Sequence, residues 1–264
     1  MLFVNNFLIL YKNVMKFESE LIESLVNSKR VSVLTGAGIS AESGIQTFRD
    51  PDGLWAKFNP AELASMDGFM SNPKLVWEWY QYRRSVINNS KPNPGHYAIA
   101  EMQEIFDEFS LITQNVDRLH HKAGSQNVIE LHGNIIENFC VECKAPFESS
   151  DDVNDDEVPI CKSCGGLVRP AVVWFGESLP EPQMTQAYKA ASNSEVFFSI
   201  GTSAEVYPAA QLPLIASDSG AVVIEVNTKH TAISGRVDFC LIGKSGEILP
   251  NLLKIIKNIK AEKI

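Results

Sequence analysis

Six short apolar runs constrain the fold of this chain more than any other feature of its sequence. They occupy residues 31–35, 109–113, 128–131, 196–201, 221–226 and 238–243. None shows the alternation of a half-exposed strand, which is typical of parallel strands covered on both faces. Helical patterns precede, separate or follow the runs, at 17–28, 73–87, 95–107, 183–191, 207–216 and 247–260. This alternation predicts an α/β fold, a Rossmann-like doubly wound parallel sheet.

Two segments interrupt the alternation. Residues 51–94 hold helical patterns but no strand, and residues 137–168 hold four cysteines and an acidic run. Both are expected to leave the sheet and to build a smaller second domain together. The sheet domain would then consist of residues 16–50, 95–136 and 169–264.

A glycine-rich turn follows the first predicted strand. In VSVLTGAGISAESG, Gly36, Gly38 and Ala41 form G-x-G-x-x-A, in which a dinucleotide pyrophosphate lies at a helix N-terminus. The alternative is a tight turn that binds nothing. A dehydrogenase would show an acid at the end of a second strand about 20 residues on, whereas Asp50 and Asp52 fall in a turn-like DPDG. The sequence therefore favours dinucleotide binding without hydride transfer.

The cysteines predict a metal site. Cys140-x2-Cys143 and Cys161-x2-Cys164 are two CxxC pairs, and each can present two thiolates to one tetrahedral zinc ion. Four sulfurs leave no position for water, so this zinc should be structural. Such clustering is typical of a reducing compartment, which favours a cytoplasmic protein. The fifth cysteine, Cys240, falls in a predicted buried strand, where we expect a core residue.

Polar side chains directly follow two of the predicted strands. Gln114, Asn115 and Asp117 come after the second run, and His132 comes after the third. The carboxyl ends of parallel strands border the ligand crevice, so these side chains should meet the dinucleotide. His132 can take a proton at neutral pH, because an unperturbed histidine has a pKa of about 6.5. The remaining histidines are expected to be structural: His96, His120, His121 and His230.

The composition argues against other classes of protein. A formal net charge of −9 does not supply the basic face that a nucleic-acid binder needs. The apolar N-terminal run LFVNNFLILY is too short to span a bilayer and lacks the flanks of a signal peptide, so we expect no membrane association. Residues 1–15 are interpreted as an N-terminal extension, with Met1 and Met15 both candidate starts.

These motifs together resemble those of the sirtuins, over nearly the whole chain from about residue 20 to 260. GAGISAESGIQTFRDPDGLW, TQNVDRLHHKAG, ELHGN, the two CxxC pairs, RPAVVWFGE, IGTSAEVYPAA and EVNT occur in the sirtuin order. The resemblance implies an NAD-dependent protein-lysine deacylase, whose small domain combines a helical module, here 51–94, with a zinc ribbon, here 137–168. Its partners would be proteins that carry acylated lysines.

The resemblance also implies roles for individual residues. The acyl oxygen attacks C1′ of the nicotinamide ribose, nicotinamide leaves, and His132 acts as general base on a ribose hydroxyl, which gives free lysine and O-acyl-ADP-ribose. Asn115 would share the catalytic site. The peptide would bind as an added strand along Val173, Phe175, Gly176 and Glu177. The implied NAD contacts are Gly36, Ala37, Gly38, Ala41, Thr47, Phe48, Arg49, Trp55, Gln114, Asn115, Asp117, Gly201, Thr202, Ser203, Asn227 and Ser245.

One helix bears on the choice of acyl group. In WEWYQYRR, Tyr80 and Arg83 have the Y-x-x-R spacing of sirtuins that remove succinyl, malonyl and glutaryl groups. Residues three apart share a helix face, and an arginine offers its planar fork to a carboxylate. The alternative is a packed aromatic helix with a solvated arginine. Pro51 stands where close relatives have a small residue, and either its ring narrows the pocket and favours acetyl or the loop shifts to accommodate it.

Three other functions remain open on the sequence. The chain could be mainly a deacetylase, or a mono-ADP-ribosyltransferase that uses the same cofactor residues. It could also be a non-catalytic NAD-sensing module with a zinc ribbon. Asn115, Asp117 and His132 argue against that last reading, because a pure binder needs no base.

Overall fold

The computed structural model describes residues 15–48, 54–148 and 157–262. The predictions for Arg49, for Pro51, for the DPDG turn, for most of the acidic run and for the N-terminal extension before Met15 lie outside these residues, as does the side chain of Trp55. No helix of the described chain is long and apolar enough to cross a membrane.

A parallel six-stranded sheet forms the centre of the molecule. Its strands are β1 (Arg30–Thr35), β2 (Glu108–Thr113), β3 (Ile129–Glu130), β7 (Val196–Ile200), β8 (Val222–Asn227) and β9 (Phe239–Ile242). They lie in the order β3-β2-β1-β7-β8-β9, and every neighbouring pair is parallel. The sequence-based prediction of a doubly wound sheet is confirmed, and each of the six apolar runs coincides with one of its strands to within one residue at each end.

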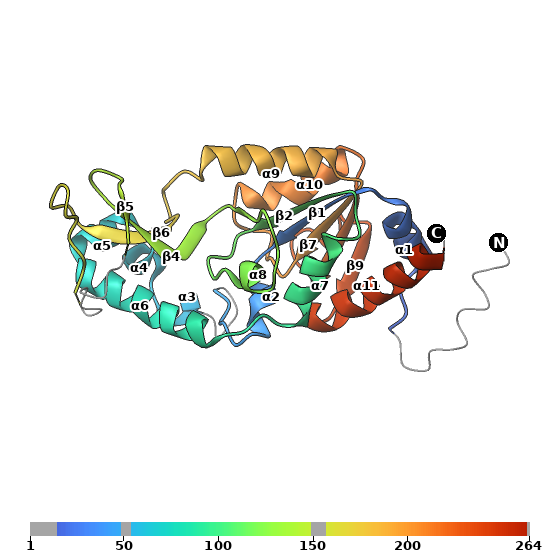
Figure 1. The fold of residues 1–264 in the computed structure, drawn as a ribbon, viewed down its shortest axis with the longest axis horizontal. Coiled ribbons are helices and arrows are strands. Elements are labelled where there is room, and N and C mark those ends of the chain that lie inside the picture. Colours follow the sequence, from blue (N-terminus) through green and yellow to red (C-terminus); the bar gives the residue numbers. More distant parts are fainter. Residues whose placement is uncertain (1–14, 49–53, 149–156, 263–264) are drawn as a thin grey trace.

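Helices cover both faces of this sheet. In Figure 1, α9 (Glu181–Asn193) and α10 (Leu212–Asp218) lie above it, and α7 (Pro94–Met102) and α11 (Ser245–Glu262) lie below it. α1 (Ser19–Asn27) packs on the same face as α7 and α11. The helix predicted at 207–216 begins only at Leu212, after a 3₁₀ turn at Ala209–Gln211, with Pro213 in its first turn.

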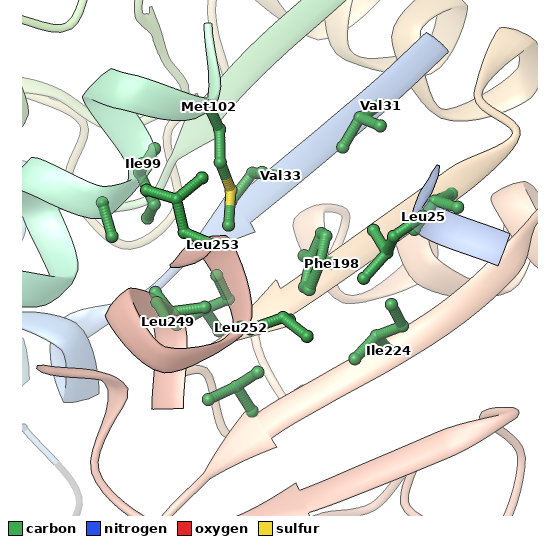
Figure 2. Packing of buried hydrophobic residues seen from close by; sticks show 14 of the residues in the cluster. Leu25, Val31, Val33, Ile99, Met102, Phe198, Ile224, Leu249, Leu252 and Leu253 are labelled. Atoms are coloured by element: carbon green, nitrogen blue, oxygen red, sulfur yellow. The ribbon is translucent and has the colours of Figure 1, made fainter. Parts of the chain in front are cut away.

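Successive residues of β7 show why the strands are apolar throughout. The Phe198 side chain points into the cluster that contains Leu25 and Leu252 (Figure 2). Phe197 points to the opposite face, where it packs with Leu212 and other residues of α9 and α10. Both phenylalanines are fully buried. Each face of the strand therefore has its own helical layer, as the absence of alternation predicts.

The prediction that Cys240 is a core residue is wrong. β9 is the last strand of the sheet, so only one of its edges is paired, and its residues are half-buried or exposed. The Cys240 thiol donates to Glu225 Oε2 at 3.4 Å. Glu225 is itself buried and also accepts from the hydroxyls of Thr231 and Ser234. A half-buried thiol at a sheet edge thus joins a polar cluster.

The second part of the molecule contains helices and a small antiparallel sheet. The helices are α3 (Leu54–Lys57), α4 (Pro60–Leu63), α5 (Met66–Ser71) and α6 (Pro73–Asn89), and the sheet is β5 (Pro146–Phe147), β4 (Gly133–Cys140) and β6 (Val168–Val172). These elements lie at the left of Figure 1, with α6 extending toward the central sheet. The helical patterns in 51–94 are confirmed. The exact domain boundaries stay a prediction.

A capping residue at its N-terminus and packing along one face stabilise α6. Asn72 caps its N-terminus by accepting from the Leu75 amide, and Pro73 occupies the first turn, where its missing N–H costs nothing. Its buried face joins a cluster with Phe69 and Trp174. The helix is therefore anchored by packing, and its side chains have fixed positions.

Candidate active site

The glycine turn lies at the reversal point of strand order. β1 has β2 on one side and β7 on the other, and ligands of open α/β sheets bind outside the carboxyl ends at such a point. The Gly36 amide donates to Ile200 O at 3.0 Å, and the Gly38 amide donates to Gly201 O at 2.7 Å. A Cβ atom on Gly38 would lie 2.7 Å from Gly201 Cα. The glycines therefore permit contact between two backbones.

One cavity of about 980 Å³ opens at this point. It extends from the glycine turn to α6 on one side and to the loops after β8 and β9 on the other. It brings together every described residue that was predicted to act in catalysis or to bind cofactor or substrate, except Trp55, whose side chain is not described: Gly36, Ala37, Gly38, Ala41, Thr47, Phe48, Tyr80, Arg83, Gln114, Asn115, Asp117, His132, Val173, Phe175, Gly176, Glu177, Gly201, Thr202, Ser203, Asn227 and Ser245.

Asn115 and Asp117 are held rigidly beside the glycine turn. The Asn115 side-chain amide donates to Gly36 O at 3.0 Å. Asp117 accepts from Ser40 Oγ at 2.7 Å and from the Leu119 amide at 2.9 Å. Burial raises the pKa of Asp117, although these hydrogen bonds oppose the rise. Ser40 lies inside the glycine motif, but nothing in its spacing marks it as the partner of an acid.

The geometry of His132 fixes which ring nitrogen carries the proton. Its Nδ1 lies 3.0 Å from the backbone oxygen of Gln114. A carbonyl oxygen only accepts, so Nδ1 carries a hydrogen, and in the neutral ring Nε2 then keeps the lone pair. The Gln114 side chain donates to Thr202 Oγ1 at 3.1 Å, which connects the ends of β2 and β7. His132 thus has the tautomer that a general base requires.

Two other histidines lie beneath this polar group. His96 and His120 are fully buried, with ring centroids 4.9 Å apart. His120 Nε2 lies 2.9 Å from Thr35 Oγ1. Burial lowers the pKa of His96 to about 4 and lowers the pKa of His120 well below its usual value. Both rings are neutral at physiological pH. They pack against each other, and His120 also contacts Thr35 at the end of β1.

Tyr80 and Arg83 line the cavity from α6. Arg83 is 7% exposed, and its Cζ lies 4.9 Å from the Trp79 ring centroid and 5.1 Å from that of Phe48. The Tyr80 hydroxyl accepts from Trp174 Nε1 at 2.8 Å. Burial raises the pKa of Tyr80 and lowers that of Arg83, whose guanidinium remains charged at neutral pH. Arg83 is therefore not solvated, in contrast to the alternative in which the helix only packs its aromatic side chains.

The segment after β6 is fixed by an ion pair. Arg169 is buried and binds both carboxylate oxygens of Glu177, with Nη2 to Oε2 at 3.0 Å. The same carboxylate accepts from the Trp174 amide at 2.8 Å. The Val173 and Phe175 amides donate to His132 O and Ala64 O, at 2.9 Å each. Sequence reasoning missed Arg169, because nothing in RPAVVWFGE distinguishes a buried arginine from a solvated one.

The far end of the cavity lies beyond β8. Asn227 donates its side-chain amide to Thr202 O at 2.9 Å. Glu42 accepts from Ser245 Oγ at 3.1 Å and from the Gly246 amide at 2.9 Å, which caps α11. Glu42 was not among the predicted residues, because a capping role between distant segments leaves no local signal. Backbone amides of the glycine turn, hydroxyls and side-chain amides along this cavity fit the phosphates and riboses of NAD.

The four cysteines of the CxxC pairs converge. Their sulfur atoms all lie within 4.8 Å of one another, with Cys140 Sγ 3.4 Å from Cys164 Sγ and Cys143 Sγ 3.7 Å from Cys161 Sγ. Zinc–sulfur bonds of about 2.3 Å in a tetrahedron require sulfurs about 3.8 Å apart. The donor set therefore fits one structural zinc ion. β4 connects this site to the cavity, because it begins directly after His132 and ends at Cys140.

Comparisons with known proteins agree with this geometry. A family model described as the Sir2 family matches residues 36–208. The chain is 53% identical to the NAD-dependent protein deacylase of Aquifex aeolicus over 79% of this chain and 87% of that protein. It is 48% identical to the enzyme of the same name from Pyrococcus furiosus, over 91% of this chain and 98% of that protein.

Solved structures give the same answer. A Sir2 homologue in complex with NAD has a TM-score of 0.87 and 41% identity, over 95% of this chain and 98% of that one. A Sir2 protein bound to a myristoylated histone peptide has a TM-score of 0.76 and 38% identity, over 92% of this chain and 97% of that one. The chain therefore belongs to the Sir2 family of NAD-dependent protein deacylases.

Proposed function

We propose that this Sir2-family enzyme removes succinyl, malonyl and glutaryl groups from protein lysines in preference to acetyl, which it also accepts. The observation that carries the proposal is the state of Arg83. Its guanidinium is buried in the cavity among aromatic rings, and in the described part of the chain no carboxylate forms an ion pair with it. Asp117 acts on Arg83 electrostatically, but its carboxylate accepts its hydrogen bonds from Ser40 and from the Leu119 amide.

A buried charge without a partner is costly. Taking an ion out of water costs several kcal/mol even after relaxation, and a carboxylate partner offsets much of that cost. The terminal carboxylate of a succinyl group would supply this partner, and the planar fork of arginine matches it. An acetyl group has no charge to offer. The environment of Arg83 thus favours acidic acyl groups.

The polar residues of the cavity would have separate roles in the reaction. When bound, NAD supplies the ribose carbon that takes the acyl oxygen and the nicotinamide that leaves. His132, with its lone pair on Nε2, would take the proton of a ribose hydroxyl. Asn115 and Asp117, fixed by Gly36 and Ser40, would hold the nicotinamide side in one orientation.

The substrate peptide would bind along the segment 173–177. The amides of Val173 and Phe175 are already bonded within the chain. Gly176 and Ser178 are exposed, and the hydrogen bonds of the described residues involve neither of their amides. An added peptide strand would therefore pair with Gly176, inside the segment, and with Ser178, directly after it. Because main-chain groups are common to all sequences, we expect loose sequence preference.

Three further parts of the proposal concern the molecule as a whole. The sheet and the zinc ribbon with its helical module would form separate domains around the cavity. The two CxxC pairs favour the cytoplasm, where thiols stay reduced and can bind a metal ion. Protein-bound acyl-lysines would be the partners, and the net charge of −9 argues against nucleic acid.

An acyl panel on one lysine peptide tests this proposal. Acetyl, succinyl, malonyl, glutaryl and myristoyl forms would be incubated with enzyme and NAD, and products followed by mass spectrometry. We expect kcat/KM for the succinyl form to exceed that for the acetyl form by about tenfold or more, which corresponds to about 1.4 kcal/mol. Equal or reversed preference would support a deacetylase. Transfer of ADP-ribose to protein would support an ADP-ribosyltransferase. Binding of NAD without turnover would support a sensing module.

A further inference from the structure

Trp174 makes a hydrogen bond that the proposed acyl recognition does not use. Its indole Nε1 donates to the Tyr80 hydroxyl at 2.8 Å, and the two side chains are 2% and 1% exposed. A phenolic oxygen that accepts one hydrogen bond still has its own hydrogen to donate. Within the described residues, no group accepts that hydrogen. Tyr80 lines the same cavity as Arg83, and a ligand there could accept this hydrogen.

Several contacts hold Trp174 in place. Its ring packs against the guanidinium of Arg169, whose Cζ lies 3.3 Å from the ring centroid, and against Phe69 at 5.3 Å. Its backbone amide donates to Glu177, the carboxylate that Arg169 binds. The indole N–H therefore has one direction available to it, toward Tyr80. An N–H that approaches the phenolic oxygen from this side leaves the opposite side for the O–H bond.

We propose that Trp174 is a positioning residue for acidic acyl groups, because it orients the Tyr80 hydroxyl as a donor toward the carboxylate that Arg83 binds. The inference rests on the acyl preference proposed above and adds a residue outside the Y-x-x-R pair. Without the indole N–H, the Tyr80 hydroxyl could turn its hydrogen away from the ligand. The acyl carboxylate would then meet a lone pair instead of a hydrogen, which weakens its binding.

The arrangement also connects two parts of the site. Trp174 belongs to the segment 173–177 along which the peptide is proposed to bind, whereas Tyr80 belongs to α6. One side chain thus couples the peptide-binding segment to the acyl pocket. Because the hydrogen bond concerns the ground-state placement of the acyl carboxylate, its loss should appear in KM for succinyl-peptide and much less in kcat.

The test uses Trp174→Phe, which keeps a ring but removes the N–H, together with Tyr80→Phe and the double variant. The measured quantity is the ratio of kcat/KM for succinyl-peptide to that for acetyl-peptide, on the full chain with NAD. We expect Trp174→Phe to lower the ratio about fivefold, from the loss of one hydrogen bond, and mainly through KM. In the Tyr80→Phe background the same change should have no further effect, because no hydroxyl remains to be oriented.

Two outcomes would overturn the inference. In the first, Trp174→Phe leaves the ratio unchanged while Arg83→Met still lowers it, which leaves the proposed function intact. In the second, Trp174→Phe lowers the ratio equally with and without the Tyr80 hydroxyl, which is what a merely structural role would do. Trp77→Phe is the matched control, because this buried tryptophan of α6 packs on Arg84 and does not line the cavity. A wild-type enzyme without preference for succinyl would overturn the inference and the proposed function together.

Discussion

The backbone amide of Gly38 donates to the carbonyl oxygen of Gly201 at 2.7 Å, which ties the glycine turn after β1 to the end of β7. The contact lies where NAD phosphates are expected, so packing and binding require the same glycines. Gly38→Ala would place a Cβ atom 2.7 Å from Gly201 Cα. We expect a loss of about 1–3 kcal/mol in the free energy of unfolding and weaker NAD binding.

Urea unfolding and calorimetric titration with NAD measure these two effects of Gly38→Ala. Gly235→Ala is the control, since a Cβ atom there would meet nothing within 4 Å. If Gly38→Ala unfolds and binds NAD as the wild type does, the close approach at this turn has no energetic importance.

Zinc removal should unfold the ribbon and disturb the active site. β4 runs from beside His132 to Cys140, so the metal site and the base share one strand. Cys161→Ser removes one of four ligands, and structural zinc contributes on the order of 10 kcal/mol of binding free energy in small domains. We expect loss of bound zinc by elemental analysis and a lower Tm. Cys240→Ser should keep the zinc; a variant at Cys161 with full zinc content and unchanged Tm would contradict the assignment.

The buried histidine His96 should make stability depend on pH. Burial lowers the pKa of His96 to about 4, whereas the unfolded chain has a pKa of about 6.5 at this residue. As the pH falls below 6.5 the unfolded state binds a proton that the folded state does not, so stability is lost between pH 6.5 and about 4. The gap in pKa corresponds to about 3 kcal/mol at most.

Replacing His96 with an uncharged residue isolates its part of this pH dependence. In His96→Gln, the side-chain oxygen can still accept from the Asn93 amide, as Nδ1 does at 3.3 Å. We expect unfolding free energies at pH 7, 5.5 and 4.5 to decline less steeply in the variant than in the wild type. Parallel declines would show that His96 is not neutral in the folded protein.

His132 should be required for acyl removal. His132→Asn removes the Nε2 lone pair, and general base catalysis is typically worth about 10²–10⁴-fold in rate. We expect kcat for acyl removal to fall by that factor, with an unchanged Tm. His121→Asn is the control, because its half-exposed ring does not line the cavity. Retained acyl removal in His132→Asn would mean that another group takes the proton.

The sequence was sufficient to predict the central sheet, and the reason is physical. Strands such as β1 and β7 are buried on both faces, so they consist of uninterrupted apolar residues that can be recognised locally. β4 and β6 were not predicted as strands. β4 carries polar residues and its pairing with β6 shifts register between Gly133 and Asn138, so it has neither an apolar run nor regular alternation.

The candidate site shows the same contrast. Residues at strand ends, such as His132 and Asn227, could be predicted because topology brings strand ends together. Ser40, Glu42 and Arg169 could not, because their roles depend on partners far away in the chain. Glu177 was predicted to bind substrate as part of a main-chain segment, and nothing in its spacing indicated that its carboxylate binds Arg169 and the Trp174 amide.

The proposed preference for acidic acyl groups depends most on Arg83, whose guanidinium would bind the acyl carboxylate. Arg83→Met keeps an apolar side chain between the rings of Trp79 and Phe48 but removes the charge. The decisive measurement is the pair of kcat/KM values for succinyl- and acetyl-peptide, in the wild type and in this variant. We predict that the ratio of succinyl to acetyl falls by about 10- to 100-fold, as expected for loss of a charge-assisted hydrogen bond worth about 1.5–3 kcal/mol. An unchanged ratio would contradict the proposed acyl preference.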